Sequence, residues 1–384
     1  MGSHQCRPKI HLCFHRRWGI SGMAGRENPA RRLHSLFINL KIQERHMHHE
    51  KLAQIAHKIM ANGRGILAAD ESTGTIKKRF DQIGVESTEQ SRNGYREMLF
   101  SADGFGDYVS GVILYDEQFR GLASNGDSLR SMIEKADAVP GIKVDKGAKD
   151  MPLRQGEKIT EGLDGLRERF AEYADMGAGF AKWRAVINIA EHIPSRGAIL
   201  ANAEALARYA ALSQEAGIVP IVEPEVIMDG AHDIDKCDEV TSATLRAVYE
   251  ALAEANVWLE GTLLKPNMVI SGTDAPSRAG REEVAERTVR CLKRHVPSAV
   301  PGIVFLSGGQ TEEEATEHLH IMNAAHDNPW PLSFSYGRAL QQAALKAWSG
   351  KNDNIPAAQA AFAHRARMNW LAARGEWSKS QEAS

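Results

Sequence analysis

Lysines and carboxylates stand at the ends of several short apolar segments in this sequence of 384 residues. The clearest case is Lys265, which lies in the apolar, β-branched segment VWLEGTLLKPNMV at 257–269. A lysine ammonium is strongly hydrated and is rarely buried without a partner. Burial there, with Lys182 nearby as a second cation, would disfavour the charged form and release a nucleophilic amine. Such an amine attacks a carbonyl carbon to form a Schiff base, so Lys265 is a candidate covalent catalyst.

Carboxylates that could transfer protons for this amine close other apolar runs. Glu223 and Glu225 lie two residues apart in VEPEV, so both point to one face of a predicted strand. Dehydration of the carbinolamine that precedes an imine needs a general acid, and these glutamates are the candidates. Cleavage of a carbon–carbon bond beside a hydroxyl group needs a base, for which Asp70 at the end of GILAAD is placed. Lys182 and Arg184 share one strand face in FAKWR in the same way.

Two glycine-containing turns predict binding of anionic groups, because each precedes a predicted helix. The turns lie in SGGQTEEE at 307–314, where Thr311 and Glu314 fit a capping box, and in SYGRALQ at 335–341. Backbone N–H groups at helix N-termini, close approach over glycine and one arginine together form a phosphate site. Hydroxyls and cations across the mouth could hold a second phosphate. The first set is Ser307, Gly308, Ser335, Gly337 and Arg338, and the second is Ser72, Thr75, Lys143 and Arg184.

Each of these residues also has a structural explanation when it is taken alone. Lys143 and Lys182 could be rim lysines, with packed apolar stems and solvated heads. Glu223 and Glu225 could then pair with them as structural ion pairs. Together, however, the residues favour a catalytic site. A barrel filled by layers of side chains has no packing use for three lysines and three carboxylates that converge at one end.

Apolar runs alternate with amphipathic helical patterns after residue 50, which predicts eight strand–helix units. This alternation is typical of an α/β closed (β/α)₈ TIM barrel, whose strand ends and following loops carry the chemistry. An open, doubly wound sheet is the alternative, but no GxGxxG turn follows the first strand. Phe180 should face the barrel interior, whereas Trp183 should meet the helices. The predicted strands are 65–70, 108–116, 139–145, 178–187, 218–227, 258–266, 301–307 and 332–337.

The ends of the chain lie outside these eight units. An extra N-terminal helix at about 50–61 is expected to cap the barrel bottom, and a C-terminal helical tail follows residue 350. Residues 1–46 carry nine arginines and lysines but only two acids. Such a leader can be an organelle transit peptide. We expect instead a disordered, dispensable extension, followed by a single domain over 47–384.

The composition argues against several kinds of partner. A formal net charge of −2 gives no whole-protein field to attract nucleic acid or an anionic membrane. No apolar run approaches the ~20 residues of a membrane helix. The four cysteines are scattered without a CxxC pair, which argues against a cysteine zinc site and fits a reducing compartment.

Seven motifs occur in the order found in class I fructose-1,6-bisphosphate aldolases, a family that the chain resembles from about residue 50 to 372. They are LAADESTGT, GIKVDKG, FAKWR, VEPEV, EGTLLKPNMV, FLSGGQ and FSYGRALQ. The resemblance implies reversible cleavage of fructose 1,6-bisphosphate to dihydroxyacetone phosphate and glyceraldehyde 3-phosphate, in glycolysis and gluconeogenesis. It also implies a lysine Schiff base without metal or other cofactor, and a cytoplasmic homotetramer.

The resemblance gives each candidate residue a role. Lys265 would form the imine, Glu223 would be the acid and base of imine formation, and Asp70 would take the hydroxyl proton during cleavage. Lys182 would stabilise charge, and Glu225 belongs to the same cluster. The residues implied for the 1-phosphate are Ser307, Gly308, Ser335, Gly337 and Arg338, and those for the 6-phosphate are Ser72, Thr75, Lys143 and Arg184.

Two features differ from the family pattern, and three other functions are alternatives. Animal members end in a tyrosine that assists enamine proton transfer, whereas the last tyrosine here is Tyr336. The basic segment before residue 47 has no counterpart in the family. A non-catalytic sugar-phosphate-binding scaffold would have lost the proton-transfer residues. A transaldolase-like enzyme would not need two phosphate sites, and a metal-dependent aldolase would need a histidine cluster at strand ends.

Overall fold

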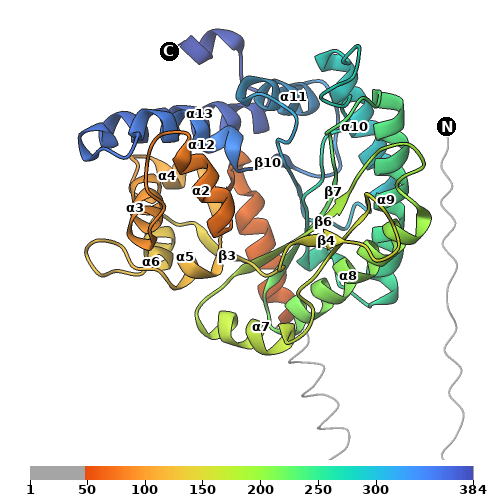
Figure 1. Ribbon diagram of the computed structural model, residues 1–384, viewed down its shortest axis with the longest axis horizontal. Helices are drawn as coiled ribbons and strands as arrows, with labels where there is room; N and C mark the ends of the chain where they lie inside the picture. The colour runs from red at the N-terminus through yellow and green to blue at the C-terminus, as the bar shows by residue number, and fades with distance from the viewer. Residues whose placement is uncertain (1–47, 384) are drawn as a thin grey trace, which may run out of the picture. The chain divides into compact units, whose positions relative to one another are not determined.

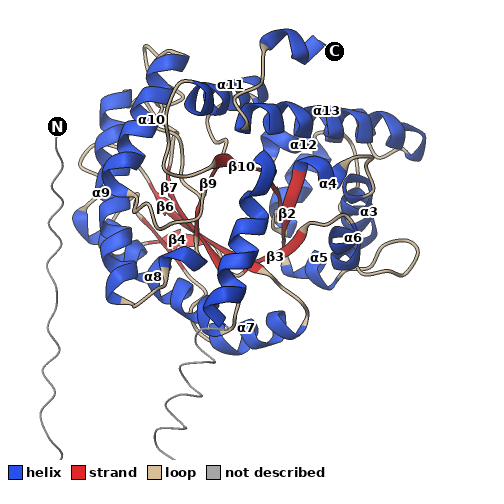
Figure 2. Ribbon diagram, turned by 180° about the vertical axis from the view of Figure 1, so that it is seen from behind, coloured by secondary structure: helices blue, strands red, loops and turns tan. Residues whose placement is uncertain are grey.

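The computed structural model describes residues 48–383, and in this part of the chain eight parallel strands close into a barrel. Helices surround the strands (Figure 1; Figure 2). The first and last barrel strands pair with each other, with Ile66 opposite Ser335. The predicted TIM barrel is therefore confirmed. In their order around the barrel, the strands are β1 (Gly65–Ala69), β10 (Leu332–Tyr336), β9 (Ile303–Phe305), β8 (Leu263–Leu264), β7 (Val219–Val226), β6 (Phe180–Ile187), β3 (Val139–Lys143) and β2 (Val109–Leu114).

Helices follow each barrel strand and cover the outside of the barrel. A helix at 48–60 precedes the first strand, and α13 with η4 forms the predicted C-terminal tail. The helices are η1 (Ala61–Gly63), α2 (Thr73–Asp81), α3 (Glu89–Phe100), α4 (Phe105–Tyr108), α5 (Asp116–Arg120), α6 (Leu129–Lys135), α7 (Leu166–Asp175), α8 (Arg196–Glu215), α9 (Ile234–Glu254), η2 (Leu259–Gly261), α10 (Arg281–His295), α11 (Glu312–Ala324), α12 (Arg338–Trp348), η3 (Asn352–Asn354), α13 (Ile355–Ala373) and η4 (Lys379–Ala383).

The barrel interior is a packed apolar core, in which a phenylalanine ring fills space opposite a glycine. Phe180 points inward as predicted, and a Cβ at Gly141 would lie 2.3 Å from its ring. Trp183 packs in the separate cluster between strands and helices, as its position in the strand predicts. Solvent and ligands can therefore enter only above this layer, at the ends of the strands.

The helix at 48–60 caps the bottom of the barrel, as expected from the sequence. Leu52, Ile59 and Met60 belong to the same buried cluster as the barrel-interior side chains. A Cβ at Gly302, just before β9, would lie 2.5 Å from Met60. The helix, at the red end of the colour scale, lies across the barrel in Figure 1. With this end closed, the carboxyl ends of the strands are the open face.

Two local features differ from the predicted strands. The segment 258–266 contains only a two-residue strand, β8, because residues Leu259–Gly261 form the 3₁₀ helix η2. The predicted strand 139–145 ends at Lys143, and the chain then forms an antiparallel hairpin of β4 (Ala148–Asp150) and β5 (Lys158–Thr160). This hairpin lies in the connection between β3 and α7, at the open face of the barrel.

The expectations for residues 1–46 lie outside the described residues. Their disorder, their dispensability and the domain boundary at 46/47 therefore stay predictions. Among residues 48–383, no helix is both long enough and apolar enough to cross a membrane.

Candidate active site

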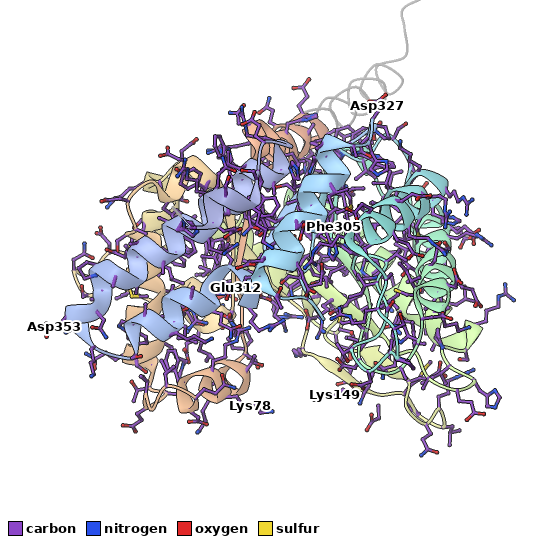
Figure 3. All side chains as sticks on the ribbon, turned by 90° about the horizontal axis from the view of Figure 1, so that it is seen from above. Lys78, Lys149, Phe305, Glu312, Asp327 and Asp353 are labelled. Atoms are coloured by element: carbon purple, nitrogen blue, oxygen red, sulfur yellow. The ribbon has the colours of Figure 1, made fainter. Side chains whose placement is uncertain are left out.

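A cavity of about 810 Å³ opens at the carboxyl ends of the barrel strands. Figure 3 labels Lys78 and Lys149, in segments that follow β1 and β3, at this end, with Asp327, which precedes β10, at the other. All the residues selected from the sequence line the cavity, although they come from seven different strand ends. They are Asp70, Ser72, Thr75, Lys143, Lys182, Arg184, Glu223, Glu225, Lys265, Ser307, Gly308, Ser335, Gly337 and Arg338.

Lys265 lies in a continuous chain of charges above the apolar layer. Its Nζ lies 3.0 Å from Glu223 Oε1, and the other oxygen of Glu223 lies 3.1 Å from Lys182 Nζ. Lys182 Nζ also lies 2.8 Å from Asp70 Oδ2. Lys265, Lys182 and Glu223 are each at most 4% exposed. The two lysines and two carboxylates therefore compensate each other in a nearly dry environment, which buried charges require.

The lysines determine the protonation of the carboxylates. Burial by itself would raise the pKa of Asp70, but the nearby charges of Lys182 and Lys265 outweigh it and hold that pKa below its ordinary value. Burial likewise opposes ionisation of Glu223, yet Lys182, Lys265 and Arg184 lower its pKa. Burial would lower the pKa of Lys182, but Asp70 and Glu223 raise it. At neutral pH both carboxylates are ionised and Lys182 is a fixed cation.

A second pair of contacts lies beside this chain, towards the β4–β5 hairpin. The Arg184 guanidinium donates a hydrogen bond from Nε to Glu225. Lys143 Nζ lies 2.7 Å from Asp145 Oδ1. Asp145 also accepts a hydrogen bond from the backbone N–H of Gly147 at 3.0 Å, so it holds the hairpin connection against β3. Glu225 therefore pairs with an arginine, whereas the structural alternative from the sequence paired it with a lysine.

The turn after β9, which the sequence predicts to bind an anion, leads directly into α11. Thr311 and Glu314 form the predicted capping box at the start of α11. Gly309 has φ +69°, and a Cβ there would lie 2.4 Å from Met228 Cγ, so glycine is required. Arg338 donates a hydrogen bond from Nη2 to the carbonyl oxygen of Gln310 at 2.9 Å, which draws the guanidinium towards this turn. The turns after β9 and β10 thus converge on one side of the cavity.

Ser72 and Thr75 lie at the start of α2, at the end of β1. Ser72 is the N-cap residue, and its Oγ lies 3.0 Å from Thr75 Oγ1. Both line the cavity together with Lys143 and Arg184, as the sequence predicted. This group of hydroxyls and cations could bind a second anion, because a helix N-terminus favours negative charge.

Several cavity residues were not selected from the sequence. Lys146 is exposed, and the described structure gives it no ion pair, whereas Tyr173 donates a hydrogen bond to Asp116 Oδ1 at 2.8 Å. Burial raises the pKa of Tyr173 to about 12. A lysine after a strand, as in GIKVDKG, was the one available signal for Lys146. Further unselected lining residues are Glu71, Arg79, Tyr115, Asp116, Arg120, Asp145, Arg169 and Glu172.

Tyr336 is not available for proton transfer in this cavity. Its hydroxyl is buried and donates to the carbonyl oxygen of Ala315 at 3.0 Å. Among residues 48–383, no group of three His, Cys, Asp or Glu side chains is arranged to hold a metal ion.

A buried lysine in contact with a carboxylate, at the carboxyl end of a (β/α)₈ barrel, is the arrangement of a Schiff-base enzyme. Comparison with known proteins identifies the family. The model of the class I fructose-bisphosphate aldolase family matches residues 51–384. The chain belongs to this family, whose members are lyases that act through a lysine Schiff base.

Individual relatives agree with this assignment. The chain is 57% identical over 329 residues to a probable class 1 fructose-bisphosphate aldolase of Xanthomonas campestris, covering 85% of this chain and 98% of that protein. It is 53% identical over 330 residues to fructose-bisphosphate aldolase 1 of Toxoplasma gondii, covering 85% and 91% respectively. A solved Plasmodium falciparum fructose-bisphosphate aldolase, in complex with TRAP and a small-molecule inhibitor, superposes with a TM-score of 0.85 at 47% identity, covering 86% of this chain and 96% of that one.

Proposed function

We propose that Lys265 is the Schiff-base lysine for cleavage of fructose 1,6-bisphosphate and that Glu223 transfers the protons of imine formation. The 3.0 Å contact between Lys265 Nζ and Glu223 Oε1 is the observation that carries this proposal. A general acid or base must lie within hydrogen-bond reach of the proton it moves. Lys182 is the other buried lysine, but two carboxylates hold it as a cation, so it is the weaker nucleophile.

Imine formation begins when the Lys265 ammonium gives a proton to Glu223 and the resulting amine attacks the C2 carbonyl of the open-chain sugar. Glu223 passes this proton to the carbonyl oxygen, which gives the carbinolamine. It then takes a second proton from the nitrogen and gives it to the carbinolamine hydroxyl, which leaves as water. The product is a protonated imine on Lys265. This cation is an electron sink for the adjacent carbon, which is the chemical reason that the class needs no metal for the step.

Cleavage of the C3–C4 bond then uses Asp70. Its carboxylate takes the proton of the C4 hydroxyl, the electron pair of the C3–C4 bond moves into the iminium, and glyceraldehyde 3-phosphate leaves. Lys182, 2.8 Å from Asp70, stabilises the changing charge. Protonation of the enamine at C3 and hydrolysis of the imine release dihydroxyacetone phosphate and restore the Lys265 amine. Glu225 supports this chemistry by holding Arg184 at the edge of the cluster.

The two phosphates are proposed to lie at opposite sides of the cavity. The side that carries the Arg338 guanidinium and the turn before α11 fits the 1-phosphate, and the side at the start of α2 fits the 6-phosphate. The residues for the 1-phosphate are Ser307, Gly308, Ser335, Gly337 and Arg338, and those for the 6-phosphate are Ser72, Thr75, Lys143 and Arg184. We also propose, from the family resemblance, a cytoplasmic homotetramer.

Reductive trapping tests the covalent step. The enzyme is incubated with dihydroxyacetone phosphate and borohydride, digested, and mapped by mass spectrometry, with Lys265→Arg as the matched control. We expect one stable adduct, on Lys265, and none in the control, because a guanidinium stays protonated and cannot form the imine. An adduct on Lys182 or Lys143 instead, or cleavage activity that chelators abolish, would overturn the proposed mechanism.

A further inference from the structure

A polar network at the wall of the cavity is not used by the chemistry described so far. Its centre is Glu71, whose side chain is 5% exposed. The Glu71 carboxylate accepts hydrogen bonds from Arg79 Nη1 at 2.5 Å, Arg96 Nη2 at 2.8 Å and Gln341 Nε2 at 2.9 Å. The three donors come from α2, α3 and α12, so helices far apart in sequence meet at one carboxylate beside Asp70.

Gln341 does more than fill a buried position. Its Nε2 also donates to the carbonyl oxygen of Ala68 at 2.8 Å. Arg96 Nη2 approaches the carbonyl oxygen of Ala69 at 3.4 Å. The two carbonyls that precede Asp70 are therefore held from opposite sides, one by α12 and one by α3. β2 pairs with β1 as far as Ala69, whereas the pairing of β10 with β1 ends at Leu67. The side-chain contacts therefore add to a strand pairing that holds the end of β1 on one side.

The same helix that holds Ala68 begins at the proposed 1-phosphate side. Gly337 is its N-cap, Arg338 is its first residue, and Gln341 lies one turn further on. The backbone N–H of Gln341 donates to the carbonyl oxygen of Gly337 at 3.2 Å. A Cβ at Gly337 would lie 3.3 Å from the Ala68 carbonyl oxygen, so this turn packs directly on the end of β1. The turn proposed to bind the 1-phosphate is therefore in direct contact with the end of the strand that precedes Asp70.

We propose that Gln341 is a positioning residue, which fixes the end of β1 so that phosphate binding at the start of α12 sets the distance from Asp70 to the C4 hydroxyl. The inference rests on the proposed roles of Asp70 and Arg338. Its distinctive consequence is a separation of two steps. Imine formation with dihydroxyacetone phosphate uses Lys265 and Glu223, whereas carbon–carbon cleavage also needs Asp70. Displacing Asp70 should therefore slow cleavage and spare imine formation.

The test variant is Gln341→Met, which keeps the length of the side chain but has no donor for Ala68 or Glu71. Gln342→Met is the matched control, because Gln342 is the next residue on α12, is only partly buried and does not contact that network. Borohydride trapping with dihydroxyacetone phosphate gives the rate of imine formation and counts folded sites. Cleavage of fructose 1,6-bisphosphate is then expressed per trappable site, which removes any contribution from unfolded protein.

For Gln341→Met we expect cleavage per site to fall about 10- to 100-fold, because a misplacement of about 1 Å can cost about 100-fold, while the trapping rate changes by less than about threefold. The control should match the wild type in both measurements. If Gln341→Met yields no trappable sites, Gln341→Asn, which withdraws the amide by one methylene, undergoes the same test.

Three results would contradict the proposal or its basis. Unchanged cleavage per site in Gln341→Met would overturn the positioning role. An equal fall in trapping and cleavage would show that the network supports the whole barrel and has no selective effect on Asp70. Asp70→Asn, measured in parallel, should show the same separation more strongly. If Asp70→Asn slows imine trapping as much as cleavage, or slows neither, the proposed role of Asp70 is wrong. The inference about Gln341 then fails because its premise about Asp70 fails.

Discussion

Replacing Lys182 with methionine tests the electrostatics of the cavity most directly. Lys182 Nζ lies 2.8 Å from Asp70 Oδ2 and 3.1 Å from Glu223 Oε2, and the side chain is 5% exposed. Methionine keeps much of the volume and apolar stem but removes the charge. Asp70 then loses the lysine that contacts it, and Glu223 keeps its contact with Lys265.

The magnitude follows from these contacts. A hydrogen bond to a charged group contributes about 1.5–3 kcal/mol, and leaving a buried charge without its partner costs about 3–5 kcal/mol. We expect the free energy of unfolding to fall by about 3–5 kcal/mol at neutral pH. In a domain of this size, this corresponds to a decrease in Tm on the order of 5–10 °C. Loss of a fixed electrostatic contact at the reacting centre should lower kcat by about 100- to 1,000-fold.

The pH dependence has a definite sign. In the wild type, burial opposes ionisation of Asp70 but the lysines outweigh it, so its pKa lies below the ordinary value. Its stabilising contribution is therefore present above a pH of about 4 and is lost as the pH falls through the lowered pKa. Without Lys182, burial dominates and the pKa of Asp70 rises. The stability deficit of the variant should then be largest at neutral pH and shrink on acidification, and the acid limb of kcat should move to higher pH.

The measurements are urea unfolding between pH 4 and 7.5 and the pH profile of kcat. Lys182→Arg is the control, because it retains the positive charge and should keep the acid limb near its wild-type position even if its geometry lowers kcat. An acid limb in Lys182→Met that stays in place, or that moves to lower pH, would refute the reasoning.

Four further variants extend these tests. Lys265→Arg should keep the wild-type circular dichroism spectrum yet lose essentially all turnover, because its guanidinium cannot form an imine. Residual cleavage near the wild-type rate would contradict this prediction. Arg338→Met should raise KM about 10- to 100-fold for both fructose 1,6-bisphosphate and fructose 1-phosphate, because both substrates lose a charge-assisted contact to the 1-phosphate. Arg184→Met should raise KM only for the bisphosphate, because only that substrate carries a 6-phosphate. Burial lowers the pKa of His318 to about 4, so the ring that contacts Gln310 is neutral in the folded protein near pH 6.5. As the pH falls, the unfolded chain binds a proton at this histidine before the folded protein does. Stability should fall by up to about 3 kcal/mol between pH 6.5 and 4, and His318→Asn should reduce this slope in urea unfolding.

The barrel and the members of its site could be predicted because both follow from local periodicity. Alternation within FAKWR placed Phe180 in the interior layer and Lys182 above it, and the structure confirms the placement of both. The positions of Glu223 and Lys265 near the ends of predicted strands likewise placed both at the open end of the barrel, and both line the cavity. These predictions required only that each strand run in one direction through the barrel.

Local departures from the prediction have causes that lie elsewhere in the chain. The segment 258–266 is apolar and β-branched enough for a full strand. Instead Trp258 stacks on His49, with ring centroids 4.3 Å apart, and η2 follows, with Gly261 close against the Trp258 ring. The β4–β5 hairpin depends in the same way on Asp145, which turns back to bind Lys143 and the Gly147 N–H. Such contacts carry no periodic signal.

The sequence by itself determined which residues of the strand ends reach the cavity, because side-chain alternation along a strand fixes which residues face its open end. Only the tertiary structure decided their partners. Glu223 lies between Lys182 and Lys265, Glu225 binds Arg184, and Gln341 holds Ala68. The physical reason is closure of the barrel, which pairs β1 with β10 and brings residues from opposite ends of the chain within hydrogen-bond distance.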